Sequence, residues 1–360
     1  MKKIIFFLRS FNPGGIEKVL ITVLNEIAKY QDVYIVVVRP EGKLMSTIRI
    51  PKEKILAMNN IHLSKTLIPF HKIIKKINPD IIITGGDIPN CIAVLEKKIF
   101  RGKFKVIISQ HNYENSETKY LKRIKFLLSY LYKGADTIIA VSNGIKQYLS
   151  NDLKIPEHRI KIIYNPIDVE ECKRLADREL SINFDYKNNR YVLFCGRLST
   201  VKNLLLTIKA FKMIEDKNIK LLICGEGSEE QKLKIAVEEL QLDDRICFCG
   251  AVNNVFPLIK HCVAGVMLST SEAFPMFVLE LYSLGKILVS TPTNGAIEIV
   301  NSKKNVFLSK DFSDVNSFAE VLKNGIRESA NLELKNSLIR RALDFDKNKI
   351  IAEYKEQLDL

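Results

Sequence analysis

The sequence predicts an α/β protein of two doubly wound domains, each built on a parallel sheet. Short apolar runs of strand length alternate with longer stretches of helical periodicity, a pattern typical of βαβ units. The alternation pauses once, in the polar and irregular stretch 170–190, and then resumes. A chain of 360 residues is long enough for two domains of ordinary size. We therefore expect the domain boundary near residues 168–190.

The first strand, over residues 4–8, leads through Asn12-Pro-Gly-Gly15 into a helix over about 17–29. The later strands are expected at 33–38, 81–84, 106–109 and 137–141 in the first half, and at 191–195, 220–224, 246–248, 263–267 and 287–289 in the second. The charged C-terminal stretch 331–360 is predicted to be helical. Within this tail, Asp344-Phe345-Asp346 is interpreted as a surface feature that holds no metal.

The composition is that of a globular protein in water, with 47% hydrophobic residues. No apolar stretch approaches the ~18–20 residues of a membrane-spanning helix. The opening MKKIIFFLRS is interrupted by Arg9, so a first strand explains it better than a signal peptide. Seven cysteines, several in strand-like runs, are expected to be reduced and buried in a cytoplasmic protein. The pair Cys247-x-Cys249 lacks a second ligand pair at zinc-like spacing, so no metal is expected there.

The net charge of +14 lies in the first half of the chain. Residues 1–168 contain 28 Lys and Arg against 14 Asp and Glu, whereas residues 169–360 contain 27 of each kind. A basic surface of this kind attracts anionic lipid headgroups or nucleic acid phosphates. The stretch 119–133 mixes cations with aromatic and aliphatic residues at helical spacing, which suits a helix lying on an anionic membrane. A core helix with a basic outer face explains it equally well.

Two motifs of the first half follow predicted strands, where open α/β sheets bind their ligands. Gly14 and Gly15 allow a tight turn and a close approach to a ligand, although a plain turn explains them equally well. His111 stands just after the strand at 106–109. A histidine there can act as a base or form a hydrogen bond with a hydroxyl, so its position favours a functional role.

Two further motifs occupy the corresponding places in the second half. Arg197 and Lys202 lie five residues apart in a loop that enters a helix. Together they can neutralise a diphosphate, arginine through its planar fork and lysine as a point charge. Gly225-Glu226-Gly227 follows the next strand, before a helix over 229–240, but a simple strand–helix turn explains it almost as well.

The stretch 271–298 combines two carboxylates with a predicted helix start. Glu272 follows a strand, Pro275 closes a turn, and the helix is expected to begin near Phe274–Phe277. The free N–H groups and the dipole of a helix N-terminus favour an anion there. Glu280 falls on the second turn, so both carboxylates can face one ligand.

Together these residues resemble the retaining glycosyltransferases of family 4. The resemblance is carried by Gly14-Gly15-x-Glu17, His111, Gly196-Arg197-Leu198 with Lys202, Gly225-x-Gly227 and, as the most specific motif, Glu272-x7-Glu280. Ala273, where glycine is usual, and Asn165-Pro-Ile-Asp168, in place of Asn-Gly-Val-Asp, depart from the pattern without removing a charged or catalytic group. The resemblance implies a GT-B fold, two Rossmann-like domains facing across a cleft. The N-terminal, acceptor-side domain would span 1–170 and the donor-binding domain 171–344, with a helix at about 345–360 packing back on the first.

The resemblance also implies roles for individual residues. Arg197 and Lys202 would bind the donor diphosphate in place of a metal ion, and Glu280 would hold the ribose hydroxyls. His111 and Glu272 would be the catalytic residues, in contact with the donor sugar. The remaining donor-binding residues would be Gly15, Phe274, Met276 and Phe277. No cofactor or metal is implied, and front-face transfer is expected because no carboxylate nucleophile is evident.

The implied activity is transfer of a sugar from a nucleotide-sugar donor, expected to be UDP-linked, to a glycan or lipid-linked acceptor in surface polysaccharide or glycolipid synthesis. The protein is expected in the cytoplasm, and peripheral contact with the inner face of the plasma membrane stays open. Alternatives are a nucleotide-sugar 2-epimerase on the same fold and a non-catalytic partner of another transferase. Nucleic acid binding rests on charge alone, since no recognisable motif supports it.

Overall fold

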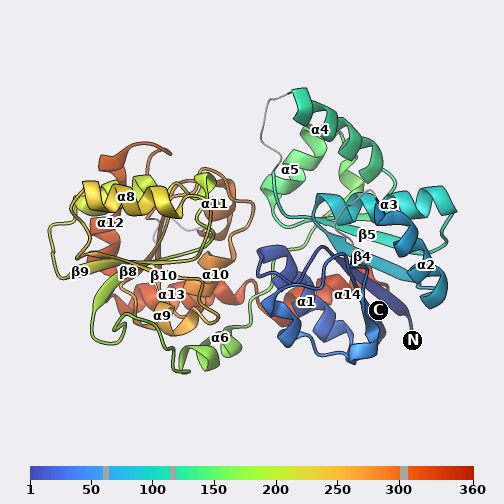
Figure 1. Cartoon of the computed structure of the whole chain (residues 1–360), viewed down its shortest axis with the longest axis horizontal. Coiled ribbons are helices and arrows are strands. Elements are labelled where there is room, and N and C mark those ends of the chain that lie inside the picture. The colour runs from blue at the N-terminus through green and yellow to red at the C-terminus, as the bar shows by residue number, and fades with distance from the viewer. Residues whose placement is uncertain (60–64, 114–118, 301–306) are drawn as a thin grey trace. The chain divides into compact units, whose positions relative to one another are not determined.

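The computed structural model describes residues 1–59, 65–113, 119–300 and 307–360, with the side chains of 119–124 outside the description as well. The chain divides into two compact units (Figure 1). Unit 1 comprises Met1–Pro166 and Asn348–Leu360, and unit 2 comprises Ile167–Lys347. Within the described residues, no helix has both the length and the apolar character needed to cross a membrane.

Unit 1 is built on a seven-stranded sheet in the order β3-β2-β1-β4-β5-β6-β7, and its strand pairs are parallel. The strands are β1 (Lys3–Leu8), β2 (Asp32–Val37), β3 (Ile55–Ala57), β4 (Ile81–Gly85), β5 (Lys105–Gln110), β6 (Thr137–Ala140) and β7 (Ile160–Ile162). Strand order reverses between β1 and β4, and open sheets bind ligands at the carboxyl ends of strands beside such a reversal. Ile4–Leu8 is buried throughout, as expected for a parallel strand covered on both faces.

The helices of unit 1 are amphipathic and bury one face each. They are α1 (Gly15–Ile27), α2 (Leu67–Ile77), α3 (Asp87–Phe100), α4 (Lys119–Tyr132), α5 (Asn143–Asn151) and α14 (Lys347–Gln357), with short 3₁₀ turns η1 (Lys43–Thr47), η2 (Lys52–Lys54) and η4 (Glu157–Arg159). In α1 the buried residues Leu20, Val23, Leu24 and Ile27 recur at helical spacing, so this face packs on the sheet.

Unit 2 has a five-stranded parallel sheet in the order β10-β9-β8-β11-β12. Its strands are β8 (Arg190–Cys195), β9 (Ile219–Cys224), β10 (Ile246–Gly250), β11 (Ala264–Met267) and β12 (Ile287–Ser290). Its helices are α6 (Val169–Ala176), the 3₁₀ turn η5 (Thr200–Lys202), α7 (Leu204–Lys212), α8 (Glu230–Glu239), α9 (Phe256–His261), α10 (Met276–Ser283), α11 (Asn294–Val300), α12 (Val315–Glu328) and α13 (Leu332–Leu343). Strand order reverses between β8 and β11, so the loops after these two strands mark the expected ligand end.

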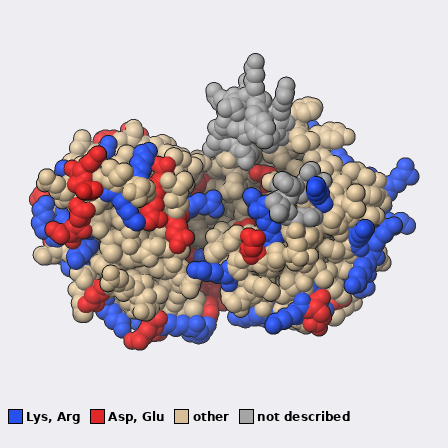
Figure 2. Space-filling model, viewed as in Figure 1, with Lys and Arg blue, Asp and Glu red and all other residues tan. Residues whose placement is uncertain are grey.

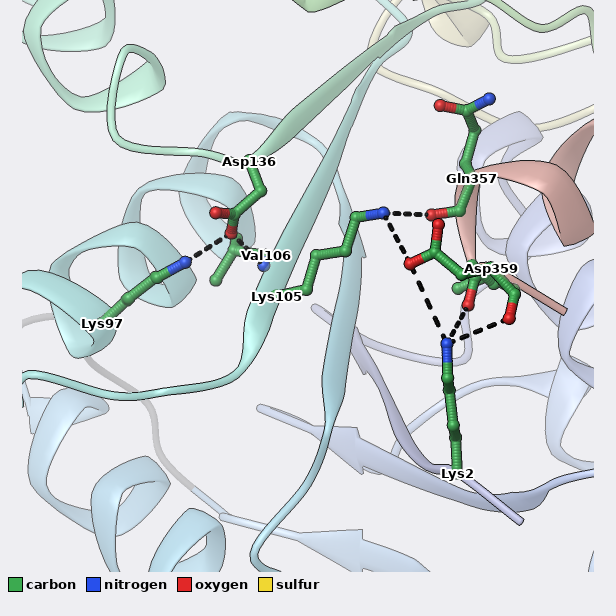
Figure 3. Close-up of polar contacts among 8 residues, drawn as sticks. Lys2, Lys97, Lys105, Val106, Asp136, Gln357 and Asp359 are labelled. Carbon is green, nitrogen blue, oxygen red and sulfur yellow. Dashed lines mark hydrogen bonds and ion pairs between the residues drawn. The ribbon is translucent and has the colours of Figure 1, made fainter.

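The C-terminal helix α14 ends against the sheet of unit 1 (Figure 1). Lys2 Nζ donates to the Leu358 carbonyl at 2.7 Å, and Lys105 Nζ donates to the Gln357 carbonyl at 2.7 Å (Figure 3). The two lysines thus satisfy the last carbonyls of a helix, whose dipole also favours cations there. Because Lys105 begins β5 and Lys2 precedes β1, α14 docks at the amino edge of the sheet. The carboxyl edge, which carries His111, stays uncovered by this helix.

The prediction of two doubly wound α/β domains with parallel sheets is confirmed. The prediction that 170–190 is irregular was wrong at its start, because α6 begins after Asp168, whose side chain accepts a hydrogen bond from Glu171 N. The C-terminal tail is helical, as predicted, in the form of α13 and α14. It breaks between α13 and α14, and Phe345 at the break is only 2% exposed, so it is not a surface feature. Asp346 instead forms a parallel bridge with Ile167.

Candidate active site

The loops that follow β8 and β9 in unit 2 pack backbone against backbone. A Cβ on Gly225 would lie 1.8 Å from Gly196 O, and one on Gly227 would lie 2.2 Å from Leu198 O, so neither position admits a side chain. Leu198 N also donates to Glu226 O at 2.9 Å. This contact fixes the loop that carries the exposed Arg197. The glycines are therefore required by loop packing, which the plain-turn interpretation of the sequence left out.

Lys202 and Glu272 are brought together in unit 2, although 70 residues separate them. Lys202 ends η5, and its Nζ donates to Glu272 Oε1 at 2.5 Å. The two side chains are 24% and 13% exposed, so the pair is partly withdrawn from solvent but reachable. Thr270 N donates to Val201 O at 2.8 Å, which joins the two loops just beside the pair.

The Lys202 side chain also passes over the arginine loop. Its Cε lies 3.8 Å from the position that a Cβ on Gly196 would take, so the ammonium group stands beside the Gly196–Arg197 backbone. Among the described residues, Arg197 has no ion-pair partner, whereas Lys202 is already paired. One corner of unit 2 thus holds two cations and one carboxylate at the carboxyl ends of β8 and β11.

The loop between β11 and α10 carries the other predicted residues of unit 2. α10 starts at Met276 after Pro275, as the sequence predicts, and within the described residues no side chain caps its N-terminus. Phe274 and Phe277 are buried, and Phe274 packs edge-to-face on Phe345 with ring centroids 5.3 Å apart. The packing of Phe274 on Phe345 holds the loop in place. Since no described side chain caps α10, the first amides of the helix can still bind an anion.

Glu280 lies on the second turn of α10 and is only 7% exposed. Glu272 is held from the other side by Gly295, whose N–H donates to Glu272 O at 3.1 Å. A Cβ on Gly295 would lie 2.6 Å from Ala273 O, so this position also requires glycine. No local sequence signal marks Gly295, because its role lies only in this close approach to the loop.

In unit 1, His111 follows β5 and is 7% exposed. Its Nε2 lies 3.0 Å from Ser109 Oγ, and the Ser109 hydroxyl donates to Thr84 O at 3.0 Å. Since that hydroxyl proton is already used, Ser109 Oγ must accept from His111 Nε2–H, which leaves Nδ1 as an acceptor. Burial lowers the pKa of His111 to about 3. His111 is therefore a neutral hydrogen-bond acceptor at physiological pH.

A buried polar network supports the same strand end, and the sequence reasoning missed it. Tyr132 OH lies 2.7 Å from Gln110 Oε1 and accepts a hydrogen bond from Asn90 Nδ2 at 3.0 Å. Gln110 Nε2 in turn donates to Asp87 Oδ1 at 2.9 Å. Burial raises the pKa of Tyr132, so it stays a hydroxyl. Polar residues inside otherwise apolar elements were the available signal, because buried polar groups need partners.

Gly15 is the first residue of α1 and is exposed, with Gly14 in extended conformation before it. Gly15 and His111 thus follow β1 and β5, which flank β4 in the sheet, and both stand at its carboxyl edge. Within the described residues, no group of three or more His, Cys, Asp or Glu side chains is arranged to hold a metal ion.

The fold and these motifs define a class, and comparison with known proteins gives the family. The family model described as "Glycosyltransferase Family 4" matches residues 13–171, and the model described as "Glycosyl transferases group 1" matches residues 177–344. One model thus falls on each half of the chain. The chain belongs to the GT-B glycosyltransferases of the family 4 type.

Individual relatives extend over nearly the full length. An N-acetylgalactosamine-N,N'-diacetylbacillosaminyl-diphospho-undecaprenol 4-alpha-N-acetylgalactosaminyltransferase of Campylobacter jejuni is 25% identical, with 97% of each chain covered. A lipopolysaccharide 1,6-galactosyltransferase of Escherichia coli is 25% identical over 73% of this chain and 70% of its own. The crystal structure of Anabaena Alr3699/HepE in complex with UDP-glucose has a TM-score of 0.81 at 18% identity, covering 100% of both chains, and confirms the fold.

Proposed function

We propose that this glycosyltransferase is retaining and metal-independent, and that it moves a sugar from a UDP-linked donor to a lipid-linked glycan. The observation that carries the proposal is the contact between Lys202 and Glu272 beside Arg197. It joins cations suited to a diphosphate with a carboxylate suited to sugar hydroxyls. The names of similar proteins add support, because one acts on a diphospho-undecaprenol-linked sugar and another holds UDP-glucose.

In this proposal Arg197 and Lys202 bind the diphosphate, and the first amides of α10, at Met276 and Phe277, help to hold its charge. Negative charge builds up on the diphosphate as the bond to the sugar breaks. Cations and amides that are already in place stabilise that charge without reorganisation. Two side-chain cations and a helix N-terminus can replace the metal ion that would otherwise neutralise the leaving group.

The two glutamates and His111 bind hydroxyl groups. Glu272 accepts from the donor sugar while it still contacts Lys202, and Glu280 accepts from the ribose. His111 accepts a hydrogen bond from the sugar through Nδ1, since its Nε2–H is used by Ser109. Because Gly15 has no side chain and is exposed, the diphosphate or the acceptor can come close to its backbone. The acceptor attacks on the face that the diphosphate leaves, and its proton passes to the departing phosphate oxygen, which gives retention.

Contact with an anionic membrane is the second part of the proposal, and α4 and α3 supply it. On α4 the side chains of Phe126, Leu127 and Tyr130 are 77%, 52% and 61% exposed, and Ile99 at the end of α3 is 56% exposed. Lys98 Nζ lies 4.3 Å above the Tyr130 ring. Figure 2 shows more Lys and Arg than Asp and Glu on the visible face of unit 1, to the right. Apolar side chains among cations fit an anionic lipid surface, where a lipid-linked acceptor would reside.

The experiment is a transfer assay with the purified protein, a set of UDP-sugars and an undecaprenyl-diphosphate-linked glycan, in EDTA. We expect a product whose anomeric configuration, determined by NMR, equals that of the donor. An inverted product would contradict retention, and activity that requires Mn²⁺ would contradict metal independence. A new UDP-sugar formed without any acceptor would identify an epimerase instead.

A further inference from the structure

A half-buried carboxylate, Asp87, lies at the carboxyl edge of the sheet of unit 1 and has no role in the proposed function. It is the first residue of α3, directly after β4. In the sheet, β4 lies between β1 and β5, which lead to Gly15 and His111. Asp87 therefore follows the middle one of three neighbouring strands, and the other two lead to candidate site residues. Open α/β sheets bind ligands at this edge, beside the reversal of strand order.

The end of β4 packs tightly between the loops on either side of it. A Cβ on Gly85 would lie 2.9 Å from Ile16 Cγ2 and 2.9 Å from Ser109 Oγ, so this position requires glycine. Ile16 belongs to the first turn of α1, and Ser109 Oγ is the partner of His111 Nε2. The backbone that leads to Asp87 is thus fixed relative to both neighbouring loops.

One oxygen of Asp87 is held by the buried polar network. Oδ1 accepts a hydrogen bond from Gln110 Nε2 at 2.9 Å, and Tyr132 OH lies 3.1 Å from it. Asn90 Nδ2 donates to Tyr132 OH at 3.0 Å and to Ser109 O at 3.0 Å. Asn90 and Tyr132 are fully buried, and Gln110 is 1% exposed. Because these groups are withdrawn from water, the network holds the Asp87 side chain in one orientation.

The second oxygen of Asp87 is not used by the network. Within the described residues, Asp87 Oδ2 has no hydrogen-bond or ion-pair partner. A carboxylate in the first turn of α3 also stabilises the helix dipole, but that effect needs only the charge. The helix and the network therefore account for the charge and for Oδ1. They leave Oδ2 as a hydrogen-bond acceptor at the ligand-binding edge of the sheet.

We propose that Asp87 Oδ2 accepts a hydrogen bond from a hydroxyl group of the acceptor sugar, and that this contact selects the acceptor. The inference rests on the proposed function, which assigns the hydroxyl groups of the donor to Glu272, Glu280 and His111. The hydroxyl groups that remain for a carboxylate in unit 1 are those of the acceptor. The charge of Asp87 repels phosphate groups, so the sugar end of a diphosphate-linked acceptor lies against it.

A carboxylate held in this way discriminates between acceptors. Its hydrogen bond to a hydroxyl group is charge-assisted and therefore stronger than a neutral one. Since Oδ1 is already bound, an acceptor that lacks the hydroxyl group leaves Oδ2 without a partner in the complex. Asp87 takes no proton in this step. It orients the acceptor while the proton of the attacking hydroxyl passes to the departing phosphate.

The test uses Asp87→Asn, which keeps an oxygen for Gln110 and Tyr132 and replaces Oδ2 by an amide group that donates. Steady-state kinetics of transfer are measured with a UDP-sugar and the undecaprenyl-diphosphate-linked glycan. We expect the KM for the glycan to rise about 10- to 100-fold, the usual effect of losing a hydrogen bond to a charged group. The KM for the UDP-sugar and the melting temperature should stay unchanged. Asp152→Asn, at an exposed position of the same unit, is the matched control and should behave like the wild type.

A second measurement identifies the hydroxyl group. Glycan acceptors that each lack one hydroxyl of the terminal sugar are compared with the parent glycan. We expect one of them to lose about tenfold or more in kcat/KM with the wild type. The same acceptor should lose little with Asp87→Asn, because the variant has already lost the contact. Equal discrimination by the wild type and the variant would contradict the contact.

The other outcomes separate this inference from the proposed function. An unchanged KM for the glycan in Asp87→Asn, or a rise in the KM for the UDP-sugar instead, would overturn the inference. A lower melting temperature with unchanged kinetics would show that Asp87 serves only the buried network. If the wild type transfers no sugar, the proposed function fails and this inference fails with it. If the wild type transfers sugar and the variant matches it, only this inference fails.

Discussion

Among single residues, Lys202 is the one whose contacts we expect to change most when a ligand binds. It is bound to Glu272 at 2.5 Å, yet a diphosphate needs the same ammonium group. The lysine has three donors, so it can keep the carboxylate and still donate to a phosphate oxygen. The contact therefore positions both side chains in advance, which lowers the entropy lost on binding.

The first prediction is that Lys202→Met weakens UDP binding while the protein stays folded. Methionine keeps the length of the side chain and removes its charge. Hydrogen bonds to charged groups contribute about 1.5–3 kcal/mol each, so we expect a loss of about 10- to 100-fold in affinity by calorimetry. Lys209→Met, at an exposed position of α7, is the matched control and should bind as the wild type does. Equal affinity in both variants would remove Lys202 from the site.

The second prediction concerns the protonation of His111. Its pKa is lowered to about 3 by burial, below the ordinary value of about 6.5. The unfolded chain binds the proton more readily, so stability should be full above pH 6.5 and decrease as the pH falls toward 3. The ¹⁵N NMR signals of His111 should report the Nε2–H form without change from pH 8 to 5.

Two variants separate the effect of the protonation of His111 from the effect of how its ring is held. His111→Gln should lose less stability between pH 6.5 and 5 than the wild type, measured by urea unfolding. Ser109→Ala removes the acceptor for Nε2–H, so both tautomers should appear in its NMR spectrum and transfer should slow. A His111 signal that titrates near pH 6.5 in the wild type would contradict the buried, neutral form.

At the scale of elements, some contacts follow from the sequence and others do not. The start of α10 at Met276 was predictable, because Pro275 is favourable at a helix start and signals it locally. The pairing of Lys202 with Glu272 was not, because it depends on how two distant loops join through Thr270 and Val201. Local signals encode where elements begin, whereas the contacts between loops arise only from tertiary packing.

The short edge strands illustrate the same limit. β3 (Ile55–Ala57) and β7 (Ile160–Ile162) have three residues each, too few to show a period, and both stand at the edges of the sheet. For this reason the sequence did not predict them.

The helix break at Phe345 could not be predicted from the sequence for another reason. Its charged neighbours suit a helix surface, whereas the phenylalanine packs on Phe274 and under Arg341, whose guanidinium carbon lies 4.7 Å from the ring centroid.

The third prediction tests the end of α14. Lys2→Met with Lys105→Met removes the cations that donate to its last carbonyls. We expect a lower melting temperature and faster amide hydrogen exchange in 350–357, since an orphaned helix terminus frays. Lys103→Met, an exposed lysine close by in the chain, is the control. Unchanged exchange in α14 would show that its apolar face alone, with Ile350, Ile351 and Tyr354 buried, holds it in place.

At the scale of the whole molecule, unit 1 contains both the excess of positive charge and the exposed apolar side chains of α4. The excess of 14 positive charges lies in residues 1–168, and the exposed side chains of α4 lie in the same unit. The side chains of 119–124, at the start of the helix expected to bind membrane, lie outside the described residues. The test therefore uses the second half of α4.

The last prediction is that Phe126→Ser with Tyr130→Ser reduces binding to vesicles. Both side chains are largely exposed, so the exchange costs little stability but removes apolar surface that would insert between headgroups. Wild-type protein should sediment with vesicles that contain phosphatidylglycerol and much less with pure phosphatidylcholine. The double variant should bind about tenfold less, as expected when apolar area is lost from the interface. Salt should weaken binding of the wild type, because it screens the attraction between lysines and anionic lipids.

The control is Ile235→Ser, which replaces an exposed apolar residue of α8 in unit 2 and should bind like the wild type. Equal binding of all three proteins would place the membrane contact elsewhere, and equal binding to both lipids would exclude an electrostatic contribution.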